Sequence, residues 1–341
     1  MKRYLIAGGA GFIGSHLVDQ LLKEHAHVTV IDNLVTGSRT NLSLQDSNKD
    51  LEFLEIDITK ALPRLDDYDI VLHLASVANP VQYEVHQMDC LLVNSVGSKN
   101  LLEVAGRSNA RYVFFSSSEI YGGHDQSVGA LTETSPSIVH LNHKRSPYFI
   151  GKMYAEEMAR TYCEAAGLDF LIVRPFNIYG PKMDVNARYG RVIPNFIKWA
   201  VSGEPLKLNG DGRQKRSFCH VEDLVGCVTR LLKKPVFEHK VVNIGTPEPI
   251  TIRELADMIN TLAGNRAGIT FTERYEYEPF YRNPDIDLVR QWVSWEPRIK
   301  LRDGLSSMIE EEIVRTGQEV RSHVPDEGTY NRIEQQLQSG L

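Results

Sequence analysis

The stretch MKRYLIAGGAGFIGSHLVDQLL, residues 1–22, decides the fold of this chain. An apolar run at 3–7 precedes three glycines, and an amphipathic segment follows at 12–22. The order predicts a strand, a glycine-rich turn and a helix. In such a turn the first glycine permits a tight bend, the second admits a pyrophosphate, and the third lets the helix pack on the strand. The glycines are Gly8, Gly11 and Gly14, and the helix N-terminus after them is predicted to face the phosphates of a dinucleotide.

A second apolar run, residues 27–31, ends at Asp32, which lies 18 residues after Gly14. An acid about 20 residues beyond such a turn hydrogen-bonds the ribose hydroxyls of a dinucleotide. A carboxylate there repels a 2′-phosphate, so NAD is predicted as the cofactor in preference to NADP. The alternative interpretation is a glycine-rich surface turn followed by an incidental acid.

Further apolar runs alternate with helical patterns along the first half of the chain. The runs lie at 51–56, 70–74, 112–115 and 170–173, and the helical stretches at 85–106 and 147–166. This alternation predicts an α/β fold with a Rossmann-type, doubly wound parallel sheet. Ligands of such sheets bind beyond the carboxyl ends of the strands, and the glycine turn, Asp32, Asp57, Ala75, Ser117 and Arg174 are predicted to lie at that edge.

Composition excludes several classes of partner. The formal charge is −6, with 24% charged and 42% hydrophobic residues, so no general attraction to nucleic acid or to an anionic membrane is expected. No run of about 18 apolar residues is present. The four scattered cysteines show no metal-ligand spacing, which favours free thiols in a cytoplasmic protein without a metal site.

The second half predicts a smaller domain that is discontinuous in sequence. We expect an NAD-binding domain over 1–176 with about 219–245, a nucleotide-sugar-binding domain over 177–218 and 246–315, and a tail over 316–341. The smaller α/β domain contains the basic stretch GDGRQKR at 210–216. That stretch is interpreted as a diphosphate clamp, with a solvated basic turn as the alternative.

Tyr148 and Lys152 stand four residues apart in SPYFIGK, about thirty residues after the serine cluster SSSEIYG at 116–122. On a helix, positions i and i+4 share one face. An ammonium beside a phenol is expected to lower the pKa of the tyrosine toward neutrality. Such a tyrosine can accept a proton from a sugar hydroxyl while hydride leaves the same carbon.

Together these motifs resemble the extended short-chain dehydrogenase/reductases that modify nucleotide sugars, and within them most closely the UDP-glucuronate decarboxylases. The resemblance covers roughly residues 1–315. It is carried by the glycine turn with its acid and by HLASVANPVQY (73–83), FSSSEIYG (115–122), RSPYFIGK (145–152), RPFNIYGP (174–181), GDGRQKRSFCHVEDL (210–224) and YRNPDI (281–286).

The resemblance implies site residues position by position. Catalytic roles fall on Ser117, Glu119, Tyr148, Lys152 and Arg282. NAD contacts are predicted at Gly8, Gly11, Phe12, Ile13, Gly14, Asp32, Asn33, Asp57, Ile58, Leu74, Ala75, Ser76, Asn94, Tyr148 and Lys152. Substrate contacts are predicted at Tyr83, Ser118, Asn177, Arg191, Leu206, Arg216 and Arg282.

The implied reaction is NAD-dependent decarboxylation of UDP-glucuronate to UDP-xylose through a 4-keto intermediate, and the implied assembly is a homodimer built on the helices at 85–106 and 147–166. Two positions depart from the family. Ser117 replaces the usual threonine but keeps the hydroxyl, and Leu92 stands where many members carry a lysine.

Alternatives remain open at this stage. A nucleotide-sugar 4-epimerase or 4,6-dehydratase uses the same oxidation, although Ser118 occupies the position of a dehydratase aspartate. A catalytically idle NAD-binding protein would keep the glycine turn without Ser117, Tyr148 and Lys152. Individually, Glu119 has a structural alternative as a hydrogen-bond acceptor, Tyr83 as a packing residue, and Arg282 as a phosphate ligand.

Overall fold

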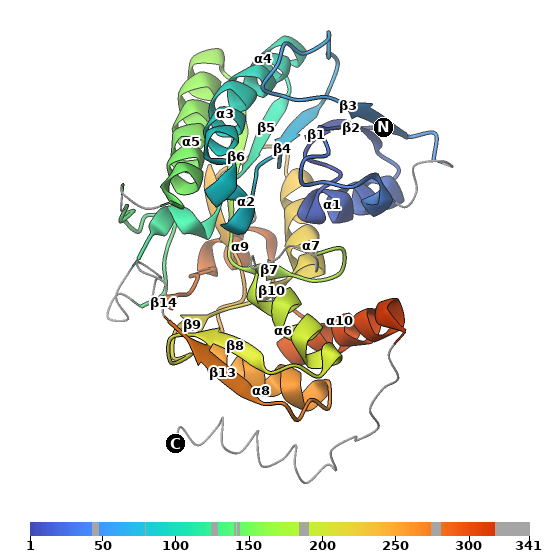
Figure 1. The fold of residues 1–341 in the computed structure, drawn as a ribbon. Helices are drawn as coiled ribbons and strands as arrows, with labels where there is room; N and C mark the ends of the chain where they lie inside the picture. Colours follow the sequence, from blue (N-terminus) through green and yellow to red (C-terminus); the bar gives the residue numbers. More distant parts are fainter. Residues whose placement is uncertain are drawn as a thin grey trace.

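A computed structural model describes residues 1–42, 48–78, 80–123, 129–139, 141, 144–183, 191–273 and 281–317, without the side chains of residues 80, 81 and 83. A parallel sheet of seven strands forms its centre (Figure 1). The strand order is β11-β6-β5-β4-β1-β2-β3. The strands are β1 (Arg3–Ala7), β2 (His27–Asp32), β3 (Leu51–Glu55), β4 (Ile70–His73), β5 (Arg111–Phe115), β6 (Phe170–Pro175) and β11 (Val241–Ile244). The order reverses between β1 and β4, which is where ligands bind in doubly wound sheets. The predicted fold class is confirmed.

Helices cover both faces of the sheet. On one face lie α1 (Phe12–Lys23) and α7 (Val221–Leu232), and on the other lie α4 (Ser98–Ser108) and α5 (Ser146–Ala166), as Figure 1 shows. Neighbouring side chains of a strand point to opposite faces. Tyr4 and Ile6 accordingly pack in the core under α1 and α7, whereas Leu5 and Ala7 pack in the core under α4 and α5. The apolar runs are therefore continuous because both faces are buried.

The helical stretch predicted over 85–106 is broken into three described pieces. Helix α3 (Gln87–Leu92) is followed by a π-helical turn, η2 (Val93–Gly97), and then by α4; a short helix, α2 (Pro80–Val85), precedes them. Side chains intervene in the backbone ladder here. Asn94 Nδ2 donates to the Cys90 carbonyl at 2.8 Å, and Ser98 Oγ donates to the Asn94 carbonyl at 3.0 Å. Such insertions change helix winding locally, and periodicity alone did not reveal them.

A smaller group of elements lies below the sheet in Figure 1. Strands β8 (Leu206–Asn209) and β13 (Ile269–Thr272) pair in parallel, and β9 (Lys215–Arg216) lies between β12 (Ile250–Thr251) and β14 (Tyr281–Arg282). Helices α6 (Val192–Ser202), α8 (Ile252–Leu262) and α10 (Leu301–Thr316) enclose a separate hydrophobic core with β8. The short pair β7 (Ile178–Tyr179) and β10 (Cys219–His220) joins this group to the sheet.

The division into two domains remains a proposal, supported by these separate cores. Helix α9 (Asp287–Val293) falls in the range predicted for the smaller domain, yet Val289 and Trp292 pack in the core under α1 and α7. We therefore propose that this helix belongs with the sheet. Residues 318–341, most of the predicted tail, lie outside the described part of the chain.

Candidate active site

A cleft of about 1590 Å³ runs between the carboxyl ends of the strands and the smaller group of elements. Segments far apart in sequence line it, from the glycine turn to β14. The cleft therefore lies at the predicted edge of the sheet, as expected for a doubly wound fold.

The glycine turn is shaped by steric necessity. Gly8 has a φ of +83°, and a Cβ there would lie 2.5 Å from the backbone nitrogen of Ala75. A Cβ on Gly14 would lie 2.2 Å from the Gly8 carbonyl oxygen. Only glycine allows the residue after β1 to approach the backbone after β4 so closely, and the first turn of α1 to pack against the Gly8 carbonyl. Gly11 lies beside the start of α1, whose first amides border the cleft.

Asp32 ends β2 within the cleft and is held by the backbone. Its Oδ2 accepts from the Ala10 amide at 3.0 Å and its Oδ1 from the Leu34 amide at 2.9 Å. Burial raises the pKa of this carboxyl group, and the two amide hydrogen bonds act against the rise. The fixed carboxylate fits ribose hydroxyls and disfavours a 2′-phosphate, so the turn and the acid together fit NAD.

The other predicted cofactor residues lie in the same cleft, with one exception. Phe12, Ile13, Asn33, Asp57, Ile58, Leu74, Ala75 and Ser76 all line it. Asn94 does not; it is fully buried and donates to Ser76 Oγ at 3.3 Å. Asn94 Nδ2 also donates to the Cys90 carbonyl at 2.8 Å, and its role as a cofactor contact stays a prediction. Asn94 thus contacts Ser76, which lines the cleft.

Helix α5 delivers Tyr148 and Lys152 to the cleft as predicted. Lys152 is 2% exposed, and its Nζ donates to the carbonyl of Phe115, at the end of β5, at 2.7 Å. The same Nζ lies 4.7 Å from the centre of the Phe114 ring. Burial lowers the pKa of Lys152 to about 7, because the charged ammonium loses its hydration.

The pKa of Tyr148 departs from the prediction. Burial raises it to about 12, and a hydrogen bond with Ser117 only partly offsets that rise. The prediction that Lys152 lowers the pKa of Tyr148 toward neutrality is therefore wrong. Its ammonium is engaged by the Phe115 carbonyl, and burial disfavours the charged form of both groups.

The serine cluster follows β5 and opens a short 3₁₀ helix, η3 (Ser118–Tyr121). Ser117 caps it, with its Oγ accepting from the Glu119 amide at 3.1 Å. Ser117, Ser118 and Glu119 all line the cleft. The cap brings the Ser117 hydroxyl beside Tyr148 and aims Glu119 into the same space.

Glu119 is paired with Arg282 of β14 through both guanidinium nitrogens Nη1 and Nη2. Arg282 is 3% exposed, while the Glu119 side chain is 34% exposed to the cleft. Burial by itself raises the pKa of Glu119, but the charges of Arg282, Arg145 and Arg216 outweigh it and hold the pKa below its usual value. Glu119 is therefore ionised at neutral pH.

The predicted substrate residues divide between cleft and core. Asn177, Arg191 and Arg216 line the cleft. Leu206 does not: it is fully buried in the core of the smaller group, whereas its neighbours Lys207 and Leu208 line the cleft, and a substrate contact at Leu206 stays a prediction. Tyr83 lies among the residues whose side chains are not described.

The basic stretch contributes less than predicted. Among its cations only Arg216 lines the cleft. Arg213 is exposed and pairs with Asp211 at 3.5 Å, and Lys215 is exposed. For these two side chains the solvated turn is the better interpretation.

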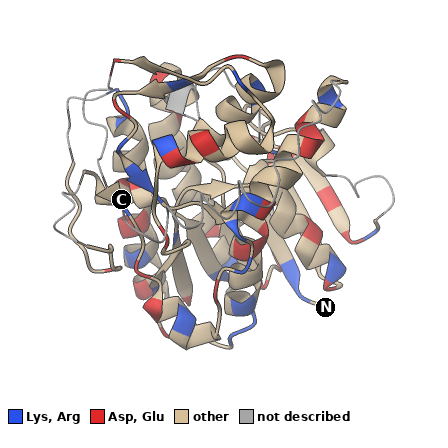
Figure 2. Ribbon diagram, turned by 90° about the horizontal axis from the view of Figure 1, so that it is seen from below, with Lys and Arg blue, Asp and Glu red and all other residues tan. Residues whose placement is uncertain are grey.

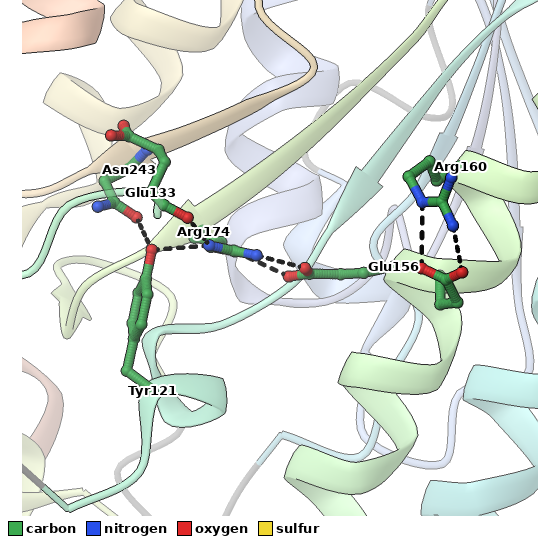
Figure 3. Close-up of polar contacts among 7 residues, drawn as sticks. Tyr121, Glu133, Glu156, Arg160, Arg174 and Asn243 are labelled. Atoms are coloured by element: carbon green, nitrogen blue, oxygen red, sulfur yellow. Dashed lines mark hydrogen bonds and ion pairs between the residues drawn. The ribbon is translucent and has the colours of Figure 1, made fainter. Parts of the chain in front are cut away.

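Sequence reasoning missed Arg145 as a residue of the cleft. Arg145 stands directly before α5, lines the cleft and pairs with Glu84 at 3.3 Å; its place in RSPYFIGK was the available signal. Arg174 lies at the carboxyl end of β6, the edge at which it was predicted, but it does not line the cleft. It binds Glu156 instead (Figure 3).

Charge is otherwise mixed over the fold. Figure 2 shows Lys and Arg segments interspersed with Asp and Glu segments along the ribbon. Among the residues that the structure describes, no helix is long and apolar enough to cross a membrane, and no group of His, Cys, Asp and Glu has the geometry to hold a metal ion.

The chain is similar in sequence and fold to several nucleotide-sugar enzymes. UDP-glucuronic acid decarboxylase 5 of Arabidopsis thaliana is 38% identical over 316 residues, which are 92% of this chain and 90% of that protein. A dTDP-glucose 4,6-dehydratase from Streptomyces venezuelae, solved with NAD bound, has a TM-score of 0.83 at 28% identity, over 93% of this chain and 99% of that one. A UDP-glucuronic acid 4-epimerase mutant from Bacillus cereus, in complex with a UDP-4-deoxy-4-fluoro-glucuronic acid and NAD, has a TM-score of 0.80 at 27% identity, over 91% and 99%.

The model of one family matches residues 4–245, which include the glycine turn, the serine cluster and the Tyr148–Lys152 pair. The chain belongs to the NAD dependent epimerase/dehydratase family.

Proposed function

We propose that this protein is an NAD-dependent UDP-glucuronate decarboxylase, which forms UDP-xylose through a 4-keto intermediate. The observation that carries the proposal is the Glu119–Arg282 pair, held in the same cleft as Tyr148 and Lys152. A site for sugar oxidation therefore adjoins a charged pair suited to a uronate. The decarboxylase relatives, at 36–38% identity over most of the chain, support this choice.

In the proposed first step, Tyr148 takes the proton of the sugar C4 hydroxyl, and Ser117 hydrogen-bonds the reacting oxygen. Bound NAD supplies the hydride acceptor for this step and the hydride donor for the last one. Lys152 stabilises the developing phenolate by charge, even though burial works against it. Asp32 and the glycine turn orient the cofactor.

In the second step the sugar is a β-keto acid, because its C5 carboxylate stands next to the new C4 carbonyl. Loss of carbon dioxide leaves the bonding electron pair in an enolate. The hydroxyls of Ser117 and Tyr148 stabilise that oxyanion. Glu119, held ionised by its arginines, acts as a hydrogen-bond acceptor rather than as an acid. Protonation of C5 and return of hydride to C4 then yield the pentose.

The direct test is product analysis with the purified protein, NAD and UDP-glucuronate. We expect one carbon dioxide for each UDP-pentose, detected by mass spectrometry, and no net reduced cofactor at completion. A nucleotide sugar of unchanged mass would reject the proposal.

That outcome would favour the second candidate, a 4-epimerase acting on a uronate. The Bacillus cereus UDP-glucuronic acid 4-epimerase mutant shares this fold over nearly its whole length, which supports that reaction as the alternative. The two reactions diverge after oxidation, because an epimerase must keep the carboxylate in place. Chromatographic separation of UDP-glucuronate from its C4 epimer distinguishes them.

We also propose a cytoplasmic homodimer. Helix α3 and the π-helical turn expose Met88, Leu92 and Val96, and α5 beside them exposes Tyr154. This apolar face, from here on the α3–α5 face, is suited to bury against the same face of a second copy. The four free, buried cysteines agree with a reducing compartment.

A further inference from the structure

A buried polar network connects the elements that carry the active site, and Arg174 lies at its centre (Figure 3). Its Nε and Nη2 donate to the two carboxylate oxygens of Glu156 at 3.0 and 2.6 Å. Its Nη1 donates to the Tyr121 hydroxyl at 2.9 Å and to the Glu133 carbonyl at 2.8 Å. The side chains of Arg174 and Glu156 are 12% and 11% exposed. A buried arginine–carboxylate fork of this kind has little rotational freedom.

Two partners of Arg174 belong to segments that carry catalytic groups. Glu156 follows Lys152 by one helical turn on α5. Tyr121 lies in η3, two residues after Glu119, and its ring lies 5.1 Å from the Arg174 guanidinium. One guanidinium therefore joins the Tyr148–Lys152 helix to the Glu119 segment.

The network continues to the segment of Arg282. The Tyr121 hydroxyl donates to Asn243 Oδ1 at 2.7 Å, and Asn243 Nδ2 donates to the Leu131 carbonyl at 2.9 Å. The Leu131 amide then donates to the carbonyl of Asn283, the residue after Arg282, at 2.8 Å. A series of hydrogen bonds, continued through the backbone of Leu131, thus links α5 and η3 to Asn283, the residue that follows β14.

We propose that Arg174 is a positioning residue that sets the Glu119–Arg282 pair in register with Tyr148 and Lys152. It does not line the cleft and touches no reacting atom. The proposed reaction oxidises C4 and removes the carboxylate from the adjacent C5, so both pairs of groups must be placed together within a fraction of an ångström. This inference rests on the proposed function for its chemical readout.

An ion pair so deeply buried is a poor source of stability, because desolvation consumes most of its attraction. A hydrophobic pair would fill the space as well. A directional fork, by contrast, specifies the angle between β6, α5 and η3, which apolar packing does not. The geometry of the network therefore serves placement more than stability.

The functional test compares Arg174→Lys and Tyr121→Phe with the control Arg160→Lys. Arg160 lies on α5, the helix of Glu156, and forms an ion pair with Glu157. Both of these side chains are about half exposed. We expect Arg174→Lys to lower kcat by about tenfold or more with KM within about twofold, because orientation rather than binding is lost. Some turnovers should stop after carbon dioxide loss and release a UDP-4-keto-pentose together with one reduced cofactor, visible at 340 nm.

A merely structural role predicts a different result. The variants would then show a lower unfolding midpoint and a smaller active fraction, with an unchanged kcat per active site and no reduced cofactor, and this result would overturn the proposal. Tyr121→Phe removes only a hydroxyl and keeps the ring in its core, so it tests the proposal even if Arg174→Lys fails to fold.

Hydrogen exchange supplies a measurement that does not depend on the reaction. The amides of Gly122, Leu131 and Asp285 donate to Glu119, Asn283 and Leu131, and so report on the linked segments. We expect these amides to exchange at least about tenfold faster in Arg174→Lys and Tyr121→Phe, and at the wild-type rate in Arg160→Lys. Unchanged exchange rates in both variants would reject the proposed role of the network. If the wild-type protein forms no pentose product, only the proposed function is rejected.

Discussion

At the scale of single residues, burial decides the protonation of the groups proposed to move protons. Desolvation raises the pKa of Tyr148 and lowers that of Lys152, so both favour their neutral forms. Glu119 is the opposite case, because three arginines overcome its burial and keep it charged. Neighbouring groups with opposed protonation preferences are typical of active sites.

Tyr148→Phe tests the proposed base. We expect kcat to fall by about 10² to 10⁴, the usual contribution of a positioned acid–base group, while NAD binding stays near wild type. The matched control is Tyr154→Phe, which removes a hydroxyl from an exposed tyrosine on the same helix. Steady-state kinetics and cofactor titration check both variants; a Tyr148→Phe enzyme of normal kcat would exclude the assignment.

Lys152 predicts a pH dependence of stability. Its pKa is about 7 in the fold and about 10.5 in an unfolded chain, so between these values the unfolded state binds more protons. The free energy of unfolding contributed by this residue therefore rises with pH from about 7 upward, by at most about 1.4 kcal/mol per pH unit. Below pH 7 the full cost of burying the ammonium remains.

Urea unfolding at pH 6.5, 7.5 and 8.5 measures this effect against Lys152→Met. We expect the free energy of unfolding of the wild type to increase relative to that of Lys152→Met as the pH rises. Parallel pH profiles of the two proteins would show that Lys152 keeps an ordinary pKa.

At the scale of elements, the first residues of three helices that border the cleft fix where each helix begins. Helix α1 begins at the glycine turn, η3 begins at the Ser117 cap, and α8 begins at a capping box. In the box, Thr251 Oγ1 accepts from the Glu254 amide at 3.1 Å, and Glu254 Oε2 accepts from the Thr251 amide at 2.7 Å. Ile252, the next residue, lines the cleft, so the cap also orients part of the wall.

Thr251→Ala should lower the free energy of unfolding by about 1 kcal/mol, because the Glu254 amide in the first turn of α8 loses its acceptor. Thr261→Ala, near the other end of α8, is the control. It removes the same hydroxyl from a helix interior where alanine is favoured, so no comparable loss is expected. Chemical denaturation measures the free energy of unfolding of both variants. Equal decreases in the two variants would mean that loss of the cap is not the cause.

At the scale of the whole molecule, two groups of elements with separate cores close on one cleft. The sheet supplies the glycine turn, the serine cluster and α5, while the smaller group supplies Arg216 and Arg282. The residues that line the cleft come from segments far apart in the sequence and from both groups of elements. Its assembly therefore depends on the docking of both groups, and on the proposed network that ties α5, η3 and β14 together.

Met88→Glu tests the proposed dimer. A charge in the centre of an apolar interface lacks hydration and a partner, so we expect a shift toward monomer in sedimentation velocity at micromolar concentration. Val314→Glu, on the exposed side of α10, adds the same charge away from the α3–α5 face and should leave the association unchanged. A wild-type protein that sediments only as a monomer would contradict the proposal.

Sequence by itself determined the features that depend on a few adjacent residues. The apolar periods indicated the strands, the glycine spacing indicated the turn, and the distance to Asp32 indicated the cofactor class. The motifs placed Ser117, Tyr148 and Lys152 correctly in the cleft. These features are local, because backbone geometry and side-chain periodicity repeat over a few residues.

Only the tertiary structure decided which distant groups meet and how they are charged. Glu119 and Arg282 stand 163 residues apart, yet they share two hydrogen bonds. Leu206 lies in the core of the smaller group, Asn94 donates to Ser76, and Arg174 binds Glu156. The pKa of Tyr148 rose instead of falling. These outcomes depend on desolvation and on packing between elements, which no short stretch of sequence specifies.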